Sequence, residues 1–316
     1  MMSDNSSDLP SGKDLFEKAV FRAQELIESG RCADAEEAME EVLALVMKLA
    51  EQDESPDWQL VIEASDRETA FDYDGVEAVH LKRLALPDGD SHVLGAHCDL
   101  ASLYVVLNRH DEAIRHAQQA TYAARKFDSP ISRAMALRSE GATHLRVGRV
   151  LEAEKCFAEA TEALDADDPA YRQMRASLLT LMASCALHRG QCDLATDYLE
   201  TADVLLRPLQ PMLSAAGVQS DLANWWATTA RLRLLLGEND DAVAAWQEAV
   251  SLARHVAELP QCEGLYARLK IATMLHHYGQ SMKKIGMDNA AQEALAGSRQ
   301  IVRDLGLPPQ QYYDSQ

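Results

Sequence analysis

A small residue recurs at one fixed place in five segments of this chain. In each segment alanine follows a turn-forming residue by five positions, and further apolar or small residues follow four and seven positions later. The five alanines lie 40, 42, 47 and 49 residues apart and are Ala113, Ala153, Ala195, Ala242 and Ala291. Self-similarity at this period predicts stacked repeats, with each alanine at a point where two helix backbones cross closely.

Two weaker segments extend the pattern toward the N-terminus. One has the same frame around Ala35, which lies 78 residues before Ala113, so one more repeat is expected between them. Its best frame uses Ala78 and Ala85, although Lys82 stands where the other repeats carry an apolar or small residue. The sequence therefore predicts about seven repeats.

Each repeat is predicted to be a helical hairpin. An apolar stripe with a period of 3.6 precedes every turn, and prolines fall at the joints between repeats, where a missing amide donor costs little. The first helices carry the segments DLASLY (99–104), RSEGATHL (138–145), LMASCAL (181–187), LANWWATTARL (222–232) and LHHYGQSM (275–282).

This pattern resembles the tetratricopeptide repeat (TPR) in its longer-period form of about 40 residues. The matching residues are Leu100, Ala101, Tyr104 and Ala113 in one repeat, Gly141, Ala153 and Phe157 in the next, and Trp226 in a later one. The resemblance covers residues 13–305 and implies an all-α, right-handed superhelical solenoid of antiparallel helix pairs. We expect one solenoid domain between a disordered N-terminal tail (1–12) and a C-terminal tail (306–316).

Composition restricts the compartment and the partners. No apolar run reaches the roughly 18 residues of a membrane span and no signal peptide is evident, so we expect a cytoplasmic protein that does not bind membranes. A net charge of −20 disfavours nucleic acid as a partner. Scattered cysteines without paired CxxC spacing indicate buried thiols rather than disulfides or metal ligands.

Motifs for catalysis are not found. The chain carries no Walker loop, no GxGxxG, no GxSxG and no HExxH. The adjacent His276 and His277 point to different helix faces, so they do not form a metal-binding pair. We therefore expect no enzyme activity, no cofactor and no metal.

The resemblance implies that the first helices line a concave groove that binds extended peptides or helices. Of 25 positions projected onto this face, five are Arg or Lys and none is Asp or Glu, although 50 acids in 316 residues predict about four. We hypothesise that the groove holds an acidic segment or a C-terminal carboxylate; ordinary intramolecular ion pairs are the alternative. The candidate groove residues are Arg138, Arg146, Asn224, Trp225, Arg231, His276, Gln280 and Lys283.

The favoured function is a non-catalytic scaffold or adaptor that binds a peptide or protein in this groove. One alternative is a peptide-sensing regulator, in which a short peptide changes the solenoid pitch and so controls a partner protein. Another is a subunit of an enzyme whose activity lies in its partner. The apolar end faces of the solenoid require caps, and homo-oligomerisation is the competing way to cover them.

Overall fold

The computed structural model describes residue 22 and residues 56–309, except 87–89, 128, 166–167, 169–170, 213–215 and 259–264. By its internal contacts the chain forms two units, residues 1–59 and 60–316. The predicted first repeat around Ala35 and the predicted tail 1–12 lie outside the described residues. No helix in the described part is long and apolar enough to span a membrane.

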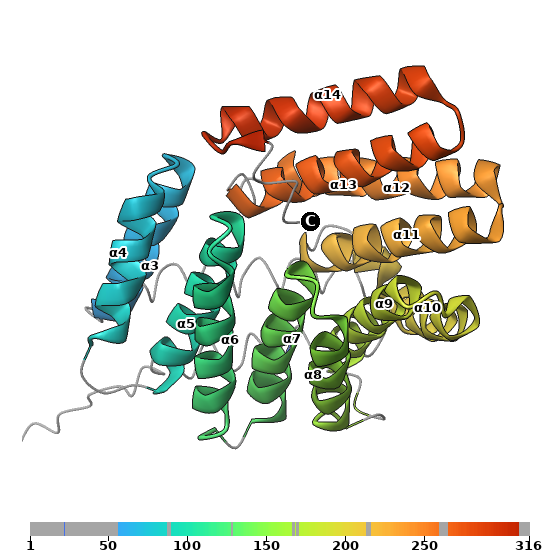
Figure 1. Cartoon of the computed structure of the whole chain (residues 1–316). Helices are drawn as coiled ribbons and strands as arrows, with labels where there is room; N and C mark the ends of the chain where they lie inside the picture. The colour runs from blue at the N-terminus through green and yellow to red at the C-terminus, as the bar shows by residue number, and fades with distance from the viewer. Residues whose placement is uncertain are drawn as a thin grey trace, which may run out of the picture. The chain divides into compact units, whose positions relative to one another are not determined.

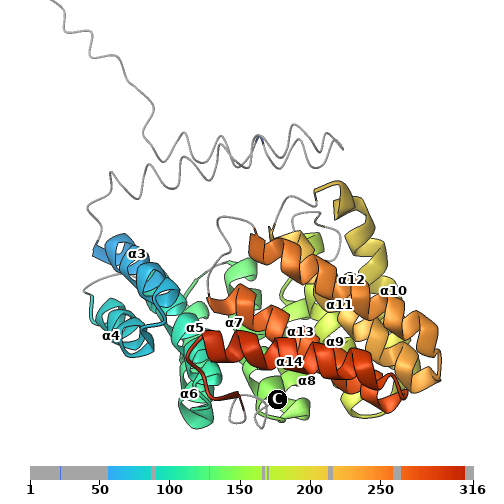
Figure 2. The same cartoon turned by 90° about the horizontal axis from the view of Figure 1, so that it is seen from above.

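The described residues form twelve α-helices that follow one another as pairs (Figure 1, Figure 2). One 3₁₀-helix, η2, lies between α10 and α11. The helices are α3 (Pro56–Thr69), α4 (Tyr73–Leu84), α5 (Asp90–Val106), α6 (His110–Ala124), α7 (Pro130–Arg146), α8 (Val150–Glu162), α9 (Arg172–His188), α10 (Cys192–Leu206), α11 (Ala216–Leu236), α12 (Asn239–Glu258), α13 (Leu265–Lys284) and α14 (Asp288–Asp304), with η2 at Arg207–Met212.

The predicted turn residues end the first helix of five pairs. All five have a positive φ. Glycine adopts this left-handed conformation freely, and asparagine adopts it more readily than most other residues. The residues and their φ values are Asn108 (60°), Gly148 (79°), Gly190 (72°), Gly237 (80°) and Gly286 (79°). The turn positions of the repeat are thus confirmed.

The recurrent alanines lie where the second helix of a pair packs against the first. Ala113, Ala153, Ala195 and Ala242 have no exposed surface, and Ala291 is 3% exposed. Two of the pairs also need glycine on the first helix: a Cβ on Gly141 would lie 2.5 Å from the Phe157 ring, and one on Gly279 would lie 2.7 Å from Leu295. The close approach of backbones predicted from the small residues is confirmed.

The frame proposed for the second repeat was wrong by two residues. Ala78, Lys82 and Ala85 are all exposed on α4 and its C-terminal cap. The packed positions are Val76 (0% exposed), followed at the same spacings by His80 and Arg83, which are both buried. The turn residue is Phe71, whose φ is 58°. A search for glycine or asparagine at the turn and for small residues at the crossing does not find this repeat, because it has Phe at the turn and Val, His and Arg at the packed positions.

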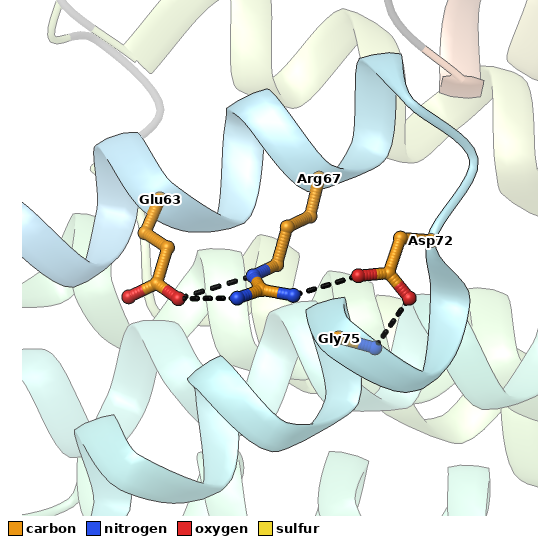
Figure 3. Close-up of polar contacts among 4 residues, drawn as sticks. All are labelled: Glu63, Arg67, Asp72 and Gly75. Atoms are coloured by element: carbon orange, nitrogen blue, oxygen red, sulfur yellow. Dashed lines mark hydrogen bonds and ion pairs between the residues drawn. The ribbon is translucent and has the colours of Figure 1, made fainter.

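Ion pairs connect α3 to the turn before α4 (Figure 3). Arg67 on α3 donates to Glu63 at 2.8 Å and to Asp72 at 2.7 Å. The other oxygen of Asp72 accepts from the backbone N–H of Gly75 at 3.0 Å and so caps α4. Since the side chains of Arg67, Glu63 and Asp72 are more than a third exposed, these pairs orient the hairpin more than they stabilise it.

The first described pairs contact the last pair, more than two hundred residues away in the chain. The Tyr73 hydroxyl on α4 donates to the Leu305 carbonyl at 2.5 Å, and the Arg268 guanidinium on α13 lies 5.4 Å from the centre of the Phe71 ring. Apolar residues surround this contact, and we call them the closure cluster: Val106, Leu265, Leu269, Ala272, Val302, Leu305 and Leu307. Leu307, in the segment expected to be a tail, is therefore packed.

Candidate functional site

The first helices of five successive pairs surround one cavity. It has a volume of about 530 Å³, within the usual range for small-ligand sites. Helices α5, α7, α9, α11 and α13 supply all of its lining except Trp246, which comes from α12. The helices predicted to form the binding face therefore do surround a hollow.

The charge of this cavity is opposite to that of the chain. Its lining includes Arg138, Arg146, Arg231 and Lys270, and no Asp or Glu among the residues described there. The remaining polar lining is neutral and comprises Ser102, Ser139, Thr143, Ser177, Thr180, Ser184, Asn224, Thr228, Tyr266, Thr273 and His277. The lining is thus positively charged in a protein whose net charge is −20.

Arg138 and Arg146 both come from α7. The Nε atom of each is buried, and no hydrogen-bond acceptor in the described part of the chain meets either one. Buried donors are normally paired, because leaving one unpaired costs about 1–3 kcal/mol. Both arginines thus have bonding capacity that a ligand in the cavity could use.

Arg231 links α11 to α9 through neutral partners. Its guanidinium donates to the Ser184 hydroxyl at 2.9 Å and to Nε2 of His188 at 3.2 Å. Burial lowers the pKa of Arg231, because a charge is less stable away from water. Burial and the nearby Arg231 charge also lower the pKa of His188, so this imidazole stays neutral and accepts the bond.

Lys270 on α13 reaches the first turns of α11. Its ammonium group donates to the Ser220 carbonyl at 2.8 Å and to the hydroxyl of the same residue. The pKa of Lys270 is lowered to about 8, mainly by burial; Asp221 acts in the opposite direction and the charge of Arg138 adds to the effect of burial. Lys270 is therefore largely charged at neutral pH, and it loses its proton at mildly basic pH.

His277 is the neutral base of the cavity. Burial lowers its pKa to about 3, and the charges of Arg231 and Arg146 act in the same direction. Its ring stacks on Trp246, with centroids 6.5 Å apart and an interplanar angle of 25°. At neutral pH His277 can therefore exchange hydrogen bonds with a ligand without contributing charge.

A smaller cavity of about 280 Å³ adjoins the first one. Arg231, Trp246 and His277 line both cavities. The other residues of the smaller cavity are Leu187, His188, Leu234, Leu235, Gln280, Ser281 and Lys284. A ligand longer than the first cavity would extend past this shared wall.

The eight predicted groove residues fall into three groups. Four line the larger cavity: Arg138, Arg146, Asn224 and Arg231. Gln280 lines the smaller cavity and donates to Nε2 of His276 at 2.7 Å. Trp225, His276 and Lys283 line neither cavity, and the Trp225 indole donates instead to the Leu199 carbonyl at 3.0 Å, as a packing residue does.

The projection from sequence missed Lys270, His277 and Tyr266. It began the inward stripe of α13 at Thr273 and continued through His276 and Lys283, whereas the cavity uses Tyr266, Lys270, Thr273 and His277. Steps of four, three and four residues keep a 3.6-residue helix on one face. Extending the stripe backward from Thr273 would have found Lys270.

Among the residues that the structure describes, one group of potential metal ligands lies outside the cavity. The ligand atoms of Glu140, His144 and Cys156 lie within 4.8 Å of one another. Burial raises the pKa of Cys156 to about 12, so this residue is a neutral thiol at physiological pH. Nε2 of His144 lies 3.7 Å from a Glu140 carboxylate oxygen. His144 and the nearby Thr121 lower the pKa of Glu140 against the effect of burial. The group fits a packing cluster as well as a binding site.

No protein-family model and no curated protein sequence matches the chain. The structure is similar to a Rap protein complexed with competence and sporulation factor, with TM-score 0.57, 13% identity and coverage of 94% of this chain and 78% of that chain. It is also similar to the Rap conjugation gene regulator of plasmid pLS20 in complex with the Phr* peptide, with TM-score 0.54, 12% identity and coverage of 95% and 97%. A third similar structure contains TPR-like repeats of a Podosopora anserina kinesin light chain, with TM-score 0.42, 20% identity and coverage of 69% and 98%. The paired helices and the similarity to the two Rap structures show that the chain has a TPR-like fold, an all-α solenoid of stacked helix pairs.

Proposed function

We propose that this protein is a non-catalytic interaction protein that binds an acidic peptide or protein segment in the larger cavity. One observation carries the proposal: the cavity contains three arginines and a lysine and no carboxylate among its described lining residues. Arginine binds a carboxylate through two parallel hydrogen bonds, and an asparagine side chain such as that of Asn224 can pair with a peptide backbone.

The fold and the size of the cavity support a short ligand. A volume of about 530 Å³ suits a peptide segment rather than a folded domain. The pLS20 Rap regulator, which shares the fold, was solved with a peptide bound. These observations favour a peptide over a large protein surface as the partner.

Regulation by peptide is a second candidate function, and the closure cluster favours it. Because Tyr73 on α4 is bonded to Leu305 beyond α14, a small change in the angle between pairs would accumulate at this contact. A peptide that altered the pitch would thus open or tighten the closure. Hydrogen exchange of the amides around Leu305, with and without peptide, separates the two candidates: a large change supports a regulator and no change supports a scaffold.

The proposal is tested with a pool of synthetic octapeptides that have free C-termini. The pool is mixed with the wild type and with an Arg138→Met/Arg231→Met variant whose helicity is first checked by circular dichroism. Peptides that co-elute with the protein in gel filtration are identified by mass spectrometry. We expect acidic peptides with the wild type and at least tenfold fewer with the variant.

Two results would contradict the proposal. One is recovery of no peptide by the wild type. The other is equal recovery by both proteins, which would move binding to the acidic outer faces or to the chain termini.

A further inference from the structure

Glu140, His144 and Cys156 form a group of potential metal ligands on the side of α7 that faces away from the larger cavity. On α7, Glu140 and His144 each follow a lining residue of that cavity, Arg138 and Ala142, by two positions. Two positions correspond to just over half a turn of a helix, at about 3.6 residues per turn. The group lines neither cavity, so it is a separate place in the fold.

A close crossing of α7 and α8 brings the three side chains together. Gly141 lies against Phe157, and a Cβ on this glycine would be 2.5 Å from the phenylalanine ring. Glu140 directly precedes that glycine, and Cys156 directly precedes the phenylalanine. His144 follows Glu140 by four positions, so both side chains lie on the same face of α7. The ligand atoms of the three residues consequently lie within 4.8 Å of one another.

Two buried polar atoms in and beside this group lack hydrogen-bond partners among the described residues. One is Nδ1 of His144, and the other is the hydroxyl oxygen of Thr121, which is near enough to affect the pKa of Glu140. Nε2 of His144 lies 3.7 Å from a Glu140 carboxylate oxygen, which is longer than a normal hydrogen bond. Buried polar atoms are rarely left without a partner, so a further atom between these side chains is indicated.

The distances suit a zinc ion. Zinc binds sulfur at about 2.3 Å and nitrogen or oxygen at about 2.0–2.2 Å in a tetrahedral arrangement, which places its ligand atoms about 3.3–3.8 Å apart. The separation of 3.7 Å between His144 and Glu140 lies in this range. The Cys156 sulfur is at most 4.8 Å from the ligand atoms of the other two residues, so a movement of about 1 Å brings it into range. We propose that Glu140, His144 and Cys156 bind one zinc ion.

The chemistry of the three ligands favours zinc over magnesium and calcium. Magnesium and calcium prefer oxygen ligands, whereas zinc binds sulfur, nitrogen and oxygen together. Binding forms a bond between zinc and the Cys156 sulfur, and the thiol proton leaves to solvent without any transfer of electrons. The thiolate and the Glu140 carboxylate then balance the charge of Zn²⁺. A neutral complex suits this place, because His144 is 5% and Cys156 is 9% exposed.

The ion would join the two helices of one repeat. Glu140 and His144 belong to α7 and Cys156 belongs to α8, so zinc links the first helix of this pair to the second. Three protein ligands leave a fourth position for water, and the Thr121 hydroxyl is a neighbouring group that can bond to that water. No short motif describes this site, because Cys156 lies twelve positions after His144 and on another helix.

The test uses the full-length protein without an affinity tag, first stripped of metal with a chelator and then dialysed. Zinc is titrated in competition with a chelating dye, and X-ray absorption at the zinc edge identifies the ligand atoms. We expect a site for one zinc, with one sulfur at about 2.3 Å and nitrogen or oxygen at about 2.0–2.2 Å. At a free zinc concentration of about one hundred times the Kd, the melting temperature should rise by about 5 °C or more.

Single variants identify the residues. Cys156→Ser, His144→Gln and Glu140→Gln should each raise the Kd for zinc at least tenfold and reduce the rise in melting temperature. Cys156→Ser should also remove sulfur from the absorption spectrum. Cys192→Ser and His255→Gln are matched controls, because Cys192 is another free cysteine, His255 is exposed, and neither belongs to the group. Both controls should bind zinc like the wild type.

Three results would overturn the proposal. One is the absence of stoichiometric zinc binding by the wild type, and another is a zinc-edge spectrum without sulfur. The third is equal zinc binding by the wild type and Cys156→Ser, or an equal loss in Cys192→Ser. The wild-type spectrum decides the question even where circular dichroism shows that a substitution disturbs the fold. Each of these results leaves the proposed peptide binding intact, because the group lines neither cavity.

Discussion

The Arg231 guanidinium on α11 donates to the Ser184 hydroxyl on α9 at 2.9 Å, so a partly buried cation is bonded to a neutral partner. In the described part of the chain no carboxylate pairs with it, although the protein carries 50 acidic residues. A buried charge without a counter-ion is costly. The absence of a carboxylate at Arg231 is consistent with a place kept for an anionic ligand.

Replacement of Arg231 by methionine should separate stability from binding. Removing an uncompensated buried charge should leave the melting temperature unchanged or raise it, while affinity for the peptide selected above falls at least tenfold. Differential scanning calorimetry and titration calorimetry measure the two effects. Arg233→Met is the matched control, since Arg233 makes exposed ion pairs with Glu238 and Asp241. A lower melting temperature with unchanged affinity would show that Arg231 is structural only.

Binding should weaken at basic pH because of Lys270. With a pKa of about 8 in the free protein, Lys270 loses its charge as the pH rises from 7 to 9.5, and the bound anion favours the charged form. Affinity for an acetylated acidic peptide should therefore fall roughly tenfold or more over this range. Lys270→Arg should bind with little pH dependence, and an equally steep profile in that variant would exclude Lys270 as the cause.

Acid should destabilise the fold through His277. Its pKa is lowered from the ordinary 6.5 to about 3, so the unfolded chain binds this proton first as the pH falls. The contribution of neutral His277 to the free energy of unfolding is therefore complete above pH 6.5 and is lost as the pH falls from 6.5 to 3. At pH 5 the loss should be roughly 1–2 kcal/mol. Urea unfolding at pH 7 and pH 5 should show a smaller difference for His277→Gln than for the wild type. The exposed His255→Gln serves as the control.

Two glycine-to-alanine substitutions should have opposite effects on stability. A Cβ on Gly141 would lie 2.5 Å from Phe157, so Gly141→Ala should cost about 1–3 kcal/mol by overpacking. A Cβ on Gly297 in α14 would lie 3.7 Å from the nearest atom, on the Leu275 side chain, which is an ordinary contact. Gly297→Ala should therefore raise the free energy of unfolding by about 0.5–1 kcal/mol, because alanine favours the helix more than glycine does. Chemical denaturation measures both. Equal effects would mean that the crossing at Gly141 is looser than described.

The corrected frame of α4 is tested by the same method. Val76 is fully buried, so Val76→Ala should cost about 2 kcal/mol. Ala78 is exposed, so Ala78→Lys should change stability by less than about 0.5 kcal/mol. A larger loss from Ala78→Lys than from Val76→Ala would restore the original frame.

The fold was predictable wherever backbone geometry restricted the residue type. Positive φ selects glycine or asparagine at the turns, and close helix crossings select alanine or glycine, so Gly148 and Ala153 were recognisable from sequence. The repeat on α4 failed the same search because Phe71 adopts the turn conformation and Val76 packs at the crossing. At Phe71 and Val76, tertiary packing therefore outweighs the usual residue preferences for a turn and for a helix crossing.

The site was predictable to the extent that helix phase was. Arg138 and Arg146 follow from the inward stripe of α7, whereas a phase drift on α13 selected His276 and Lys283 in place of Lys270 and His277. The contact between Tyr73 and Leu305 joins residues 232 positions apart, and no local pattern reports such a contact. It depends on the sum of small rotations between successive pairs.

The central claim is tested most directly by a crystal structure of the protein with the peptide selected from the pool. The account predicts a peptide in the larger cavity, with at least one of its carboxylates within hydrogen-bonding distance of Arg138, Arg146 or Arg231. A peptide on the outer surface of the second helices, with the cavity free of ligand, would contradict the account.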